Sequence, residues 1–408
     1  GLPSEYFGDL LVPAWADHRV ERYVPKIQGA GTTSIRKPFI QGGKQFYPSG
    51  LSVAPDGSLF VTDWGSKSYE LHGKGAVWHV RLKEGKPDAS KNPGGLASGD
   101  RRKRDAAARK LGETAEGRAT LRNGLASPSV RVQASCLDAL IAVGDKEDLF
   151  GVARGTGELP LRALAVRGLA ARTLNVSEFL DAKQPAVLRV EAIASSFDTA
   201  ALAALFADAD PYLRHAAIYR FKEIPTDLMS VDTAKLKDPK QRVGLVLAWR
   251  ATRVIHDPVI TNALADPDPD VRLIAAKWVA DERLEEYRTL IVKQLARTDL
   301  DPRSLIAFTT TLARLDNKPV NEDALAGYLL ARVNDAKASS SARLLALRGI
   351  PSGFAKLKTE TLLDWLKDSD EALRLEILRL LTERADAKTT TTTALRAVVS
   401  DRQSPYIA

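Results

Sequence analysis

The spacing of apolar residues changes along the chain. Within residues 1–81, short apolar runs alternate with turn residues, and two of them, GDLLVPAW (8–15) and GSLFVTDW (57–64), each pass from a glycine through a strand-like run to a tryptophan. From about residue 101 onward, apolar residues recur every three or four positions, which is the spacing of amphipathic helices. The pattern predicts strands followed by helices.

The two strand phrases predict neighbouring blades of a β-propeller. Trp15 and Trp64 lie about 50 residues apart, close to the length of one blade, and each is followed by a polar loop and a further strand. Two blades cannot bury both of their faces. We therefore expect residues 1–81 to be the C-terminal blades of a truncated β-propeller.

The helical part repeats itself. In the segment 265–281, Asp268 is placed to cap a helix and Pro269 to occupy its first turn. The residues expected on the buried face of that helix are Val271, Ile274, Ala275, Trp278 and Val279. An arginine recurs near the start of successive predicted helices, at Arg131, Arg162, Arg189, Arg214, Arg242, Arg272, Arg303, Arg343 and Arg374.

This region resembles HEAT-like repeats. The phrase D-x-D-P-x-[VL]-R occurs at 208–214 and at 266–272, and in such repeats the arginine and aspartate form a ladder between neighbouring turns. We expect an α-solenoid over residues 101–408, with its last repeat cut short and each helix pair burying its apolar stripe against the next. Residues 82–100, rich in glycine, proline, serine and lysine, predict a linker. The predicted fold is a β-propeller fragment joined to an α-solenoid of HEAT-like repeats.

The amino-acid composition excludes some classes of site and of structure. Lysine and arginine number 59 against 51 acidic residues, a net charge of +8 that suits an anionic partner or a solvated helix surface. The single cysteine, Cys136, excludes an intramolecular disulfide and a cysteine-based zinc site, and its helical setting predicts a buried structural thiol. No apolar run reaches the ~20 residues of a membrane span.

Motifs for nucleotide binding, zinc-dependent proteolysis, serine hydrolysis and covalent haem attachment are absent from the sequence. His215 and His256 fall within helical repeats and are expected to pack or lie at the surface. No metal site is predicted. The candidate chemistry is therefore confined to the β-like segment.

Asp63 and Trp64 end a predicted strand, and Tyr69 and His72 lie in the loop that follows. His72 could act as a general base oriented by Asp63, and the rings of Trp64 and Tyr69 could stack on a sugar or cofactor. In the structural alternative, the aspartate ties down a neighbouring loop and the tryptophan packs between blades. His18 is the matching ligand-binding candidate in the preceding segment.

Residues 46–81, followed by a linker and HEAT-like repeats, resemble the PVC-type haem-binding proteins, a family of membrane-bound dehydrogenases. The segment carries the family's Asp-Trp, Tyr and His-Gly-Lys-Gly, which adds Lys74 to the ligand-binding candidates. Residues 76–79 read Ala-Val-Trp-His where the family usually has Arg-Ile-Trp-Arg. Losing both arginines weakens the case for an anionic ligand there.

The resemblance implies an exported, periplasmic or otherwise extracytoplasmic dehydrogenase that passes electrons from an organic substrate, such as a sugar, to haem c. In this reading the propeller holds the substrate and the repeats dock a partner. The chain, from Gly1 to its final SDRQSPYIA, is expected to be an internal fragment, inactive alone, with haem c in a missing C-terminal part and no cofactor of its own.

Two other functions stay open. The first is a non-enzymatic scaffold that binds a protein or glycan on the concave face of the solenoid and uses the propeller as a second binding platform. The second is a basic HEAT-like nucleic-acid binder, which the absence of a lysine stripe recurring with the repeat disfavours.

Overall fold

The structure is a computed structural model of the chain. It describes residues 2, 4–6, 8–54, 57–83, 95–335, 337–368, 370–384 and 392. The chain divides into two compact units, Gly1–Arg220 and Phe221–Ala408, which are described separately. Residues 84–94 of the predicted linker, and almost all of the chain after residue 384, lie outside the described residues. The domain boundaries at 81 and 100 stay predictions.

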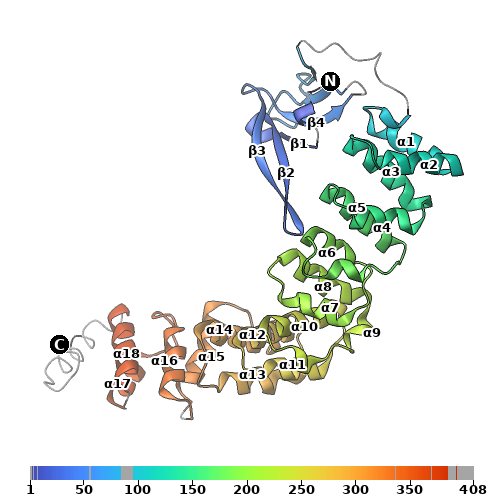
Figure 1. Cartoon of the computed structure of the whole chain (residues 1–408). Coiled ribbons are helices and arrows are strands. Elements are labelled where there is room, and N and C mark those ends of the chain that lie inside the picture. Colours follow the sequence, from blue (N-terminus) through green and yellow to red (C-terminus); the bar gives the residue numbers. More distant parts are fainter. Residues whose placement is uncertain are drawn as a thin grey trace. The chain divides into compact units, whose positions relative to one another are not determined.

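The first sheet is antiparallel, in the order β1-β2-β3. Its strands are β1 (Leu10–Ala14), β2 (Arg19–Gln28) and β3 (Gly31–Gln41), preceded by a short 3-10 helix, η1 (Ser4–Tyr6). β1 pairs only with residues 19–23 of β2, so beyond Tyr23 the β2–β3 hairpin continues as a two-stranded ribbon (Figure 1).

The second sheet is also antiparallel, in the order β4-β5-β6. Its strands are β4 (Pro48–Val53), β5 (Leu59–Asp63) and β6 (Ala76–Val80). Side chains along β5 alternate between buried and exposed, as a strand with one covered face requires. Leu59 and Val61 form a small core together with Val20 of β2. This core holds the β region, β1–β6, together.

The expected propeller is wrong. The described residues form two small three-stranded antiparallel sheets, whereas a propeller blade is a four-stranded sheet placed around a central channel. The two strand phrases are not equivalent: the first lies in β1, at the edge of its sheet, and the second in β5, the central strand of the other. A shared run of apolar residues ending in tryptophan specified a strand but not its position in a sheet.

A helical body follows in the first unit. Its α-helices are α1 (Arg101–Gly112), α2 (Ala115–Gly124), α3 (Val130–Val143), α4 (Lys146–Arg154), α5 (Leu159–Ala171), α6 (Ala186–Ile193), α7 (Thr199–Ala204) and α8 (Pro211–Glu223). Short 3-10 helices are η2 (Trp15–Asp17), η4 (Gly95–Ala97), η5 (Ser177–Leu180) and η6 (Leu205–Ala207). Helices close in sequence pack together, α1 on α3, α3 on α5 and α5 on α6.

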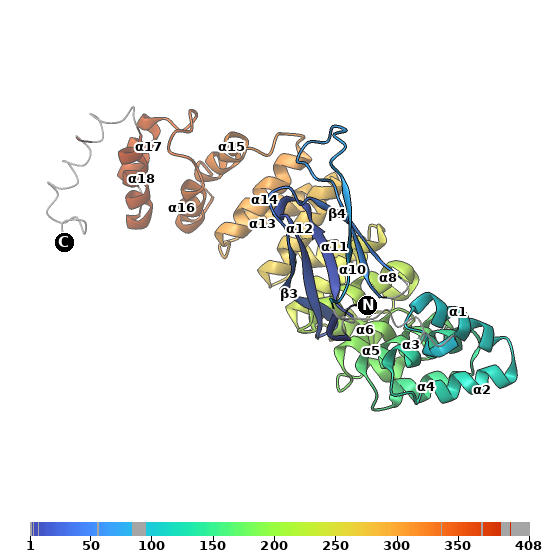
Figure 2. The same cartoon turned by 90° about the horizontal axis from the view of Figure 1, so that it is seen from above.

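The second unit is helical throughout its described part. Its α-helices are α9 (Pro225–Leu228), α10 (Pro239–Thr252), α11 (Asp257–Leu264), α12 (Pro269–Glu282), α13 (Arg288–Leu295), α14 (Pro302–Leu315), α15 (Glu322–Val333), α16 (Ser340–Arg348), α17 (Thr359–Asp368) and α18 (Glu371–Glu383), with 3-10 helices η7 (Thr233–Lys235) and η8 (Glu285–Tyr287). The series α10, α12, α14, α16 and α18 packs in chain order, and Figure 2 shows α14 to α18 following one another.

Local signals account for these helices. The Asp268 side chain accepts hydrogen bonds from the amides of Asp270 and Val271, and Pro269 occupies the first turn of α12. The apolar face of α12 is buried around Trp278.

Some of the recurring arginines donate to backbone carbonyls before their own helix and pair with an aspartate further along the chain. The Arg242 guanidinium donates to the carbonyl oxygens of Leu236 and Lys237, and its Nε and Nη2 lie 2.7 and 3.0 Å from the Asp266 carboxylate. Arg189 pairs with Asp208 through one of its guanidinium nitrogens, Nη2, at 2.8 Å. The ladder expected from the sequence is therefore present at these positions, where it has a structural role.

Candidate functional site in the β region

Asp63 lies at the end of β5, where its carboxylate is buried. Its Oδ1 accepts hydrogen bonds from the backbone amides of Tyr47 (2.7 Å) and Gly65 (2.9 Å), and its Oδ2 accepts one from the indole Nε1 of Trp78 (2.9 Å). None of these bonds goes to His72. The carboxylate thus fixes the chain before β4, the chain after β5, and β6.

His72 contacts Trp64 instead of Asp63. The two rings meet edge to face with centroids 5.2 Å apart. The Nδ1 of His72 accepts a hydrogen bond from the backbone amide of Lys74 (2.9 Å), so the neutral ring carries its proton on Nε2. That Nε2 is buried without a hydrogen-bond partner in the described part of the chain. The imidazole is therefore held by its loop, away from the carboxylate expected to orient it.

The loop between β5 and β6, residues 64–75, is fixed by its own hydrogen bonds. Trp64 donates from Nε1 to the carbonyl oxygen of Ser68 at 2.6 Å, and its amide donates to the carbonyl of Tyr47 at 2.8 Å. Gly65 has φ +73°, and a Cβ there would overlap the Lys74 carbonyl, so glycine is required where the two ends of the loop meet. The side chain of Lys74 is exposed.

A row of four rings connects this loop with the first sheet. Tyr69 stacks on Trp15 with an interplanar angle of 13° and centroids 5.9 Å apart, Trp15 lies 4.9 Å from Tyr47, and Tyr47 lies 4.7 Å from His18. We call these four residues the aromatic row. Tyr47 is buried, whereas Tyr69 is 86% exposed. The row thus runs from the interior to the surface, where only one face of the Tyr69 ring is covered by Trp15.

His18 closes the inner end of the aromatic row. Its backbone is left-handed, with φ 55°, and its Nδ1 lies 2.9 Å from the carbonyl oxygen of Phe46, to which it donates. Its own carbonyl accepts from the amide of Gly42 at 2.9 Å. Through its Nδ1 and its carbonyl oxygen, His18 therefore joins the β1–β2 connection to the segment before β4.

Leu71 is the most exposed of these residues. Its side chain is 97% exposed, two positions after Tyr69 in the same loop. The sequence reasoning did not select Leu71, Trp15 or Tyr47 as site residues. An isolated leucine among polar loop residues was a usable signal for Leu71. The pairing of Trp15 with Tyr69 had no signal in the sequence, because it depends on how the two sheets pack.

The structure brings the candidate residues together in two groups. Tyr69 and His18 belong to the aromatic row, and Trp64, His72 and the Lys74 backbone belong to the loop beside it. No group of three or more histidine, cysteine or acidic residues suited to a metal occurs among the described residues. Similarly, no helix within the described ranges is long and apolar enough to cross a membrane.

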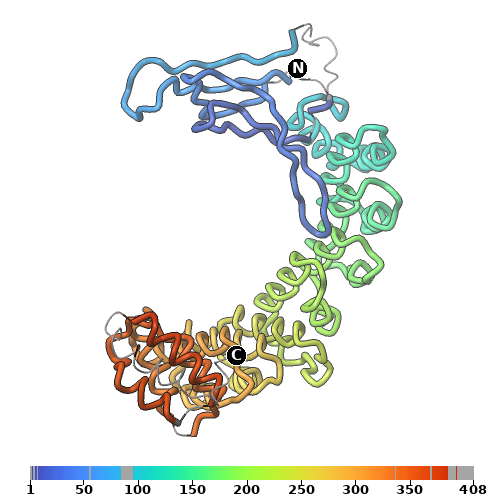
Figure 3. Tube along the Cα trace, turned by 90° about the vertical axis from the view of Figure 1, so that its left-hand side faces the viewer, coloured from blue at the N-terminus to red at the C-terminus, as the bar shows by residue number. Residues whose placement is uncertain are grey.

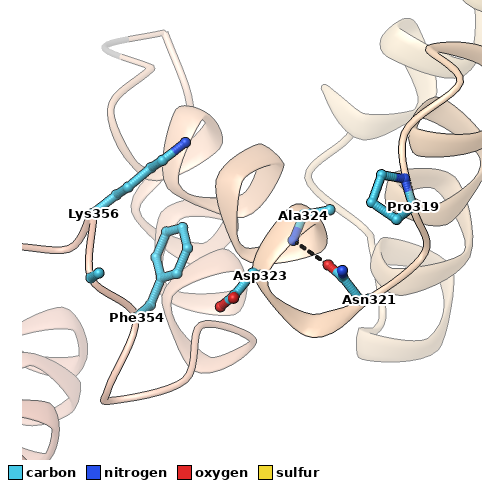
Figure 4. Close-up of a pocket in the computed structure, with 7 residues that line it drawn as sticks. Pro319, Asn321, Asp323, Ala324, Phe354 and Lys356 are labelled. Atoms are coloured by element: carbon cyan, nitrogen blue, oxygen red, sulfur yellow. Dashed lines mark hydrogen bonds between the residues drawn. The ribbon is translucent and has the colours of Figure 1, made fainter.

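A pocket of about 380 Å³ lies elsewhere, in the second unit. Its lining includes Asp323, Phe354 and Lys356, which Figure 4 shows near the start of α15. The side chain of Asn321 also faces the pocket, but its Oδ1 accepts from the Ala324 amide at 2.9 Å and caps α15. These groups form no set of converging catalytic side chains.

Comparisons with known proteins add little. No protein-family model matches the chain, and no curated protein matches it. Among solved structures, the X-ray structure of YibA from Escherichia coli is similar over 67% of this chain and 95% of that one, at 17% sequence identity and a TM-score of 0.26. That score is too low to support an argument about fold or function.

The resemblance to the PVC-type haem-binding proteins and the extracytoplasmic location stay predictions. The dehydrogenase expected from that resemblance placed its substrate in a propeller, and the described residues form no propeller. Asp63, the residue expected to orient a catalytic base, makes its three hydrogen bonds to other groups. No observation on the described residues therefore favours oxidoreductase chemistry.

Proposed function

We propose that this chain is a non-enzymatic scaffold and that its β region binds a partner protein through the loop between β5 and β6. One observation carries the proposal: Tyr69 and Leu71, 86% and 97% exposed, project from a loop whose backbone is already fixed. Large apolar side chains exposed together at the surface are typical of interaction sites.

The energetics of the loop support this proposal. Burying a leucine or an aromatic side chain contributes about 1.5–3 kcal/mol. A preorganised loop loses little conformational entropy on binding, so more of that contribution appears as affinity. The loop is held by the hydrogen bonds of Trp64 and Lys74, and by stacking of Tyr69 on Trp15. Tyrosine is enriched among the residues that dominate interface energies.

Charged side chains lie in the same loop as Tyr69 and Leu71. Lys67, Glu70 and Lys74 are exposed in the same loop, which provides the polar rim that protein interfaces have. A glycan is the other ligand class that such rings accept. Leu71 favours a protein, because an aliphatic side chain offers a sugar neither a flat ring face nor a hydrogen bond.

The proposal is tested by affinity capture of the full chain from lysate of its own organism, with quantitative mass spectrometry. A protein retained by the wild type should be lost from the variant Y69S/L71S, with binding at least roughly tenfold weaker, because two anchors are removed. The control is Val53→Ser, which removes an apolar side chain of 71% exposure from β4, outside the loop.

A glycan array run with the same variants separates the two ligand classes. Glycan binding that requires Tyr69 but tolerates Leu71→Ser would contradict the protein-binding proposal. Equal capture by the wild type and Y69S/L71S would contradict it as well.

A further inference from the structure

The tip of the β2–β3 hairpin presents a backbone donor that its own sheet does not use. The last ladder pair is Gln28 with Gly31, so Gly29 and Ala30 form a two-residue turn. Gly29 has φ +61°, at the position where a type II′ turn requires glycine. The amide of Ala30 lies outside the ladder, and it donates to the Oδ2 of Asp210 at 2.6 Å.

Asp210 immediately precedes α8, and its carboxylate accepts hydrogen bonds from two backbone amides. Its Oδ1 accepts a hydrogen bond from the amide of Tyr212, in the first turn of α8, at 2.8 Å. Its Oδ2 receives the amide of Ala30, which lies 180 residues away along the chain. One carboxylate therefore organises the start of a helix and holds the tip of the hairpin. Figure 3 shows the blue hairpin extending along the green helical segment of the first unit.

The contact depends on the absence of side chains at the tip. A Cβ atom at Gly29 would overlap the Asp210 carboxylate, and one at Gly31 would overlap the ring of Tyr212. Glycines on both sides of Ala30 thus let the backbone approach α8 closely. The hairpin tip and the start of α8 are complementary in shape as well as in hydrogen bonding.

A second aspartate in the same sequence phrase shows what is special about Asp210. Asp268 holds the corresponding position before α12, and its Oδ1 accepts from the amides of Asp270 and Val271. These bonds are local to its own helix. The D-x-D-P phrase therefore explains why an aspartate caps both α8 and α12. The bond to the amide of Ala30 is a second role, which Asp210 has and for which Asp268 shows no counterpart among the described residues.

We propose that the β2–β3 hairpin is a strap whose tip locks onto α8 through Ala30 and Asp210, and that the lock opens while both elements stay folded. Beyond Tyr23 the strap is a ribbon whose β3 side chains from Thr32 to Ile35 are exposed. Within the described part of the chain, the ribbon is held by its own ladder, by one distant hydrogen bond and by the close approach of Gly31 to Tyr212. A tip held in this way can be released without loss of the strand pairing.

The experiment is hydrogen exchange of the full chain, followed by mass spectrometry on the peptide that spans the hairpin tip. In Asp210→Ala, exchange at the tip should be about tenfold faster than in the wild type, the factor that corresponds to one hydrogen bond. The matched control, Asp268→Ala, loses an equivalent helix cap and should leave exchange at the tip unchanged.

A second pair of variants leaves the cap of α8 intact. Gly31→Val keeps a strand-forming residue in β3 but prevents the tip from seating against Tyr212, so exchange at the tip should again rise. Ser34→Val, on the exposed ribbon, is its control and should have no effect. Wild-type exchange in either Asp210→Ala or Gly31→Val overturns the proposal, as does equal acceleration in Asp268→Ala.

Discussion

Asp63 gathers three donors from three different segments around one buried carboxylate. A buried acceptor of this kind contributes mainly through the cost of leaving its partners unpaired. The sequence indicates that Asp63 has a specific role, because a charged side chain at the end of an apolar strand requires hydrogen-bond partners. Its role depends on Tyr47, Gly65 and Trp78, and these positions become neighbours only in the folded chain.

We expect Asp63→Ala to lower the free energy of unfolding of the β region by about 2–3 kcal/mol, because it leaves buried donors unsatisfied. Urea unfolding followed by tryptophan fluorescence measures this change. The control is Asp17→Ala, whose side chain is 58% exposed and pairs with Arg19 at the surface. That variant should cost less than about 1 kcal/mol. Equal losses in both variants would contradict the structural role assigned to Asp63.

At the scale of elements, helices were predictable and sheets were not. The caps, prolines and apolar spacing that define α12 are all local in the sequence, so Asp268 and Trp278 were placed correctly. Strand pairing is set by residues far apart. Nothing near Trp15 or Trp64 distinguishes an edge strand from a central one, so two similar phrases were read as two equivalent blades.

Some residues of the candidate site could be predicted from the sequence, but the contacts between them could not. Tyr69 and His72 were identified because their loop is unusual in an otherwise helical chain. The stacking of Tyr69 on Trp15 required the packing of two sheets, which periodicity does not encode. The sequence therefore indicates which side chains are unusual, but not which surface these side chains form together.

Helices α13, α14 and α15 are linked by one acidic residue, which provides a pH-dependent prediction. Asp316 receives hydrogen bonds from Arg288 at 3.0 and 3.3 Å and from the hydroxyl of Tyr328. The bond from Arg288 is the main reason that the pKa of Asp316 is lowered. Burial, followed by the bond to Asp316, raises the pKa of Tyr328 to about 12.

Because the pKa of Asp316 is lower in the folded chain, its stabilising contribution is complete above the unfolded pKa of about 3.9 and is lost as the pH falls through the folded value. We expect Asp316→Asn to be less stable than the wild type at pH 7, with a difference that shrinks below about pH 4. Thermal unfolding at several pH values measures this. The control, Asp364→Asn, changes an exposed carboxylate, and a pH-independent difference for Asp316→Asn would contradict the assignment.

At the scale of the whole molecule, the helices pack mainly against neighbours in sequence. Such an arrangement confines a perturbation to nearby elements, because stability is approximately a sum of local and nearest-neighbour contributions. We expect Trp278→Ala to cost about 3–5 kcal/mol locally, since a fully buried ring is removed from α12.

Hydrogen exchange tests how far that loss spreads. Amides of α10, α12 and α14 should exchange faster in Trp278→Ala, and those of β5 should not change. Acceleration throughout both units would show that the chain unfolds as one cooperative body.

Part of the hydrogen-bonding capacity of the arginines is used within the chain. Arg189, Arg214, Arg242 and Arg272 direct guanidinium donors to backbone carbonyls or aspartates of the ladder. Donors committed in this way are not free for phosphates, so these four arginines offer no support for the nucleic-acid alternative.

The bond between Ala30 and Asp210 also bears on how the first unit folds. Helices of the body form through contacts close in sequence, which are fast, whereas this bond closes a separation of 180 residues. Closing so long a segment carries a large entropic cost while the intervening chain is unfolded, and a much smaller one after the helices between have packed. We therefore expect the hairpin tip to seat late in folding, so that protection of the Ala30 amide would report when α8 has reached its native place.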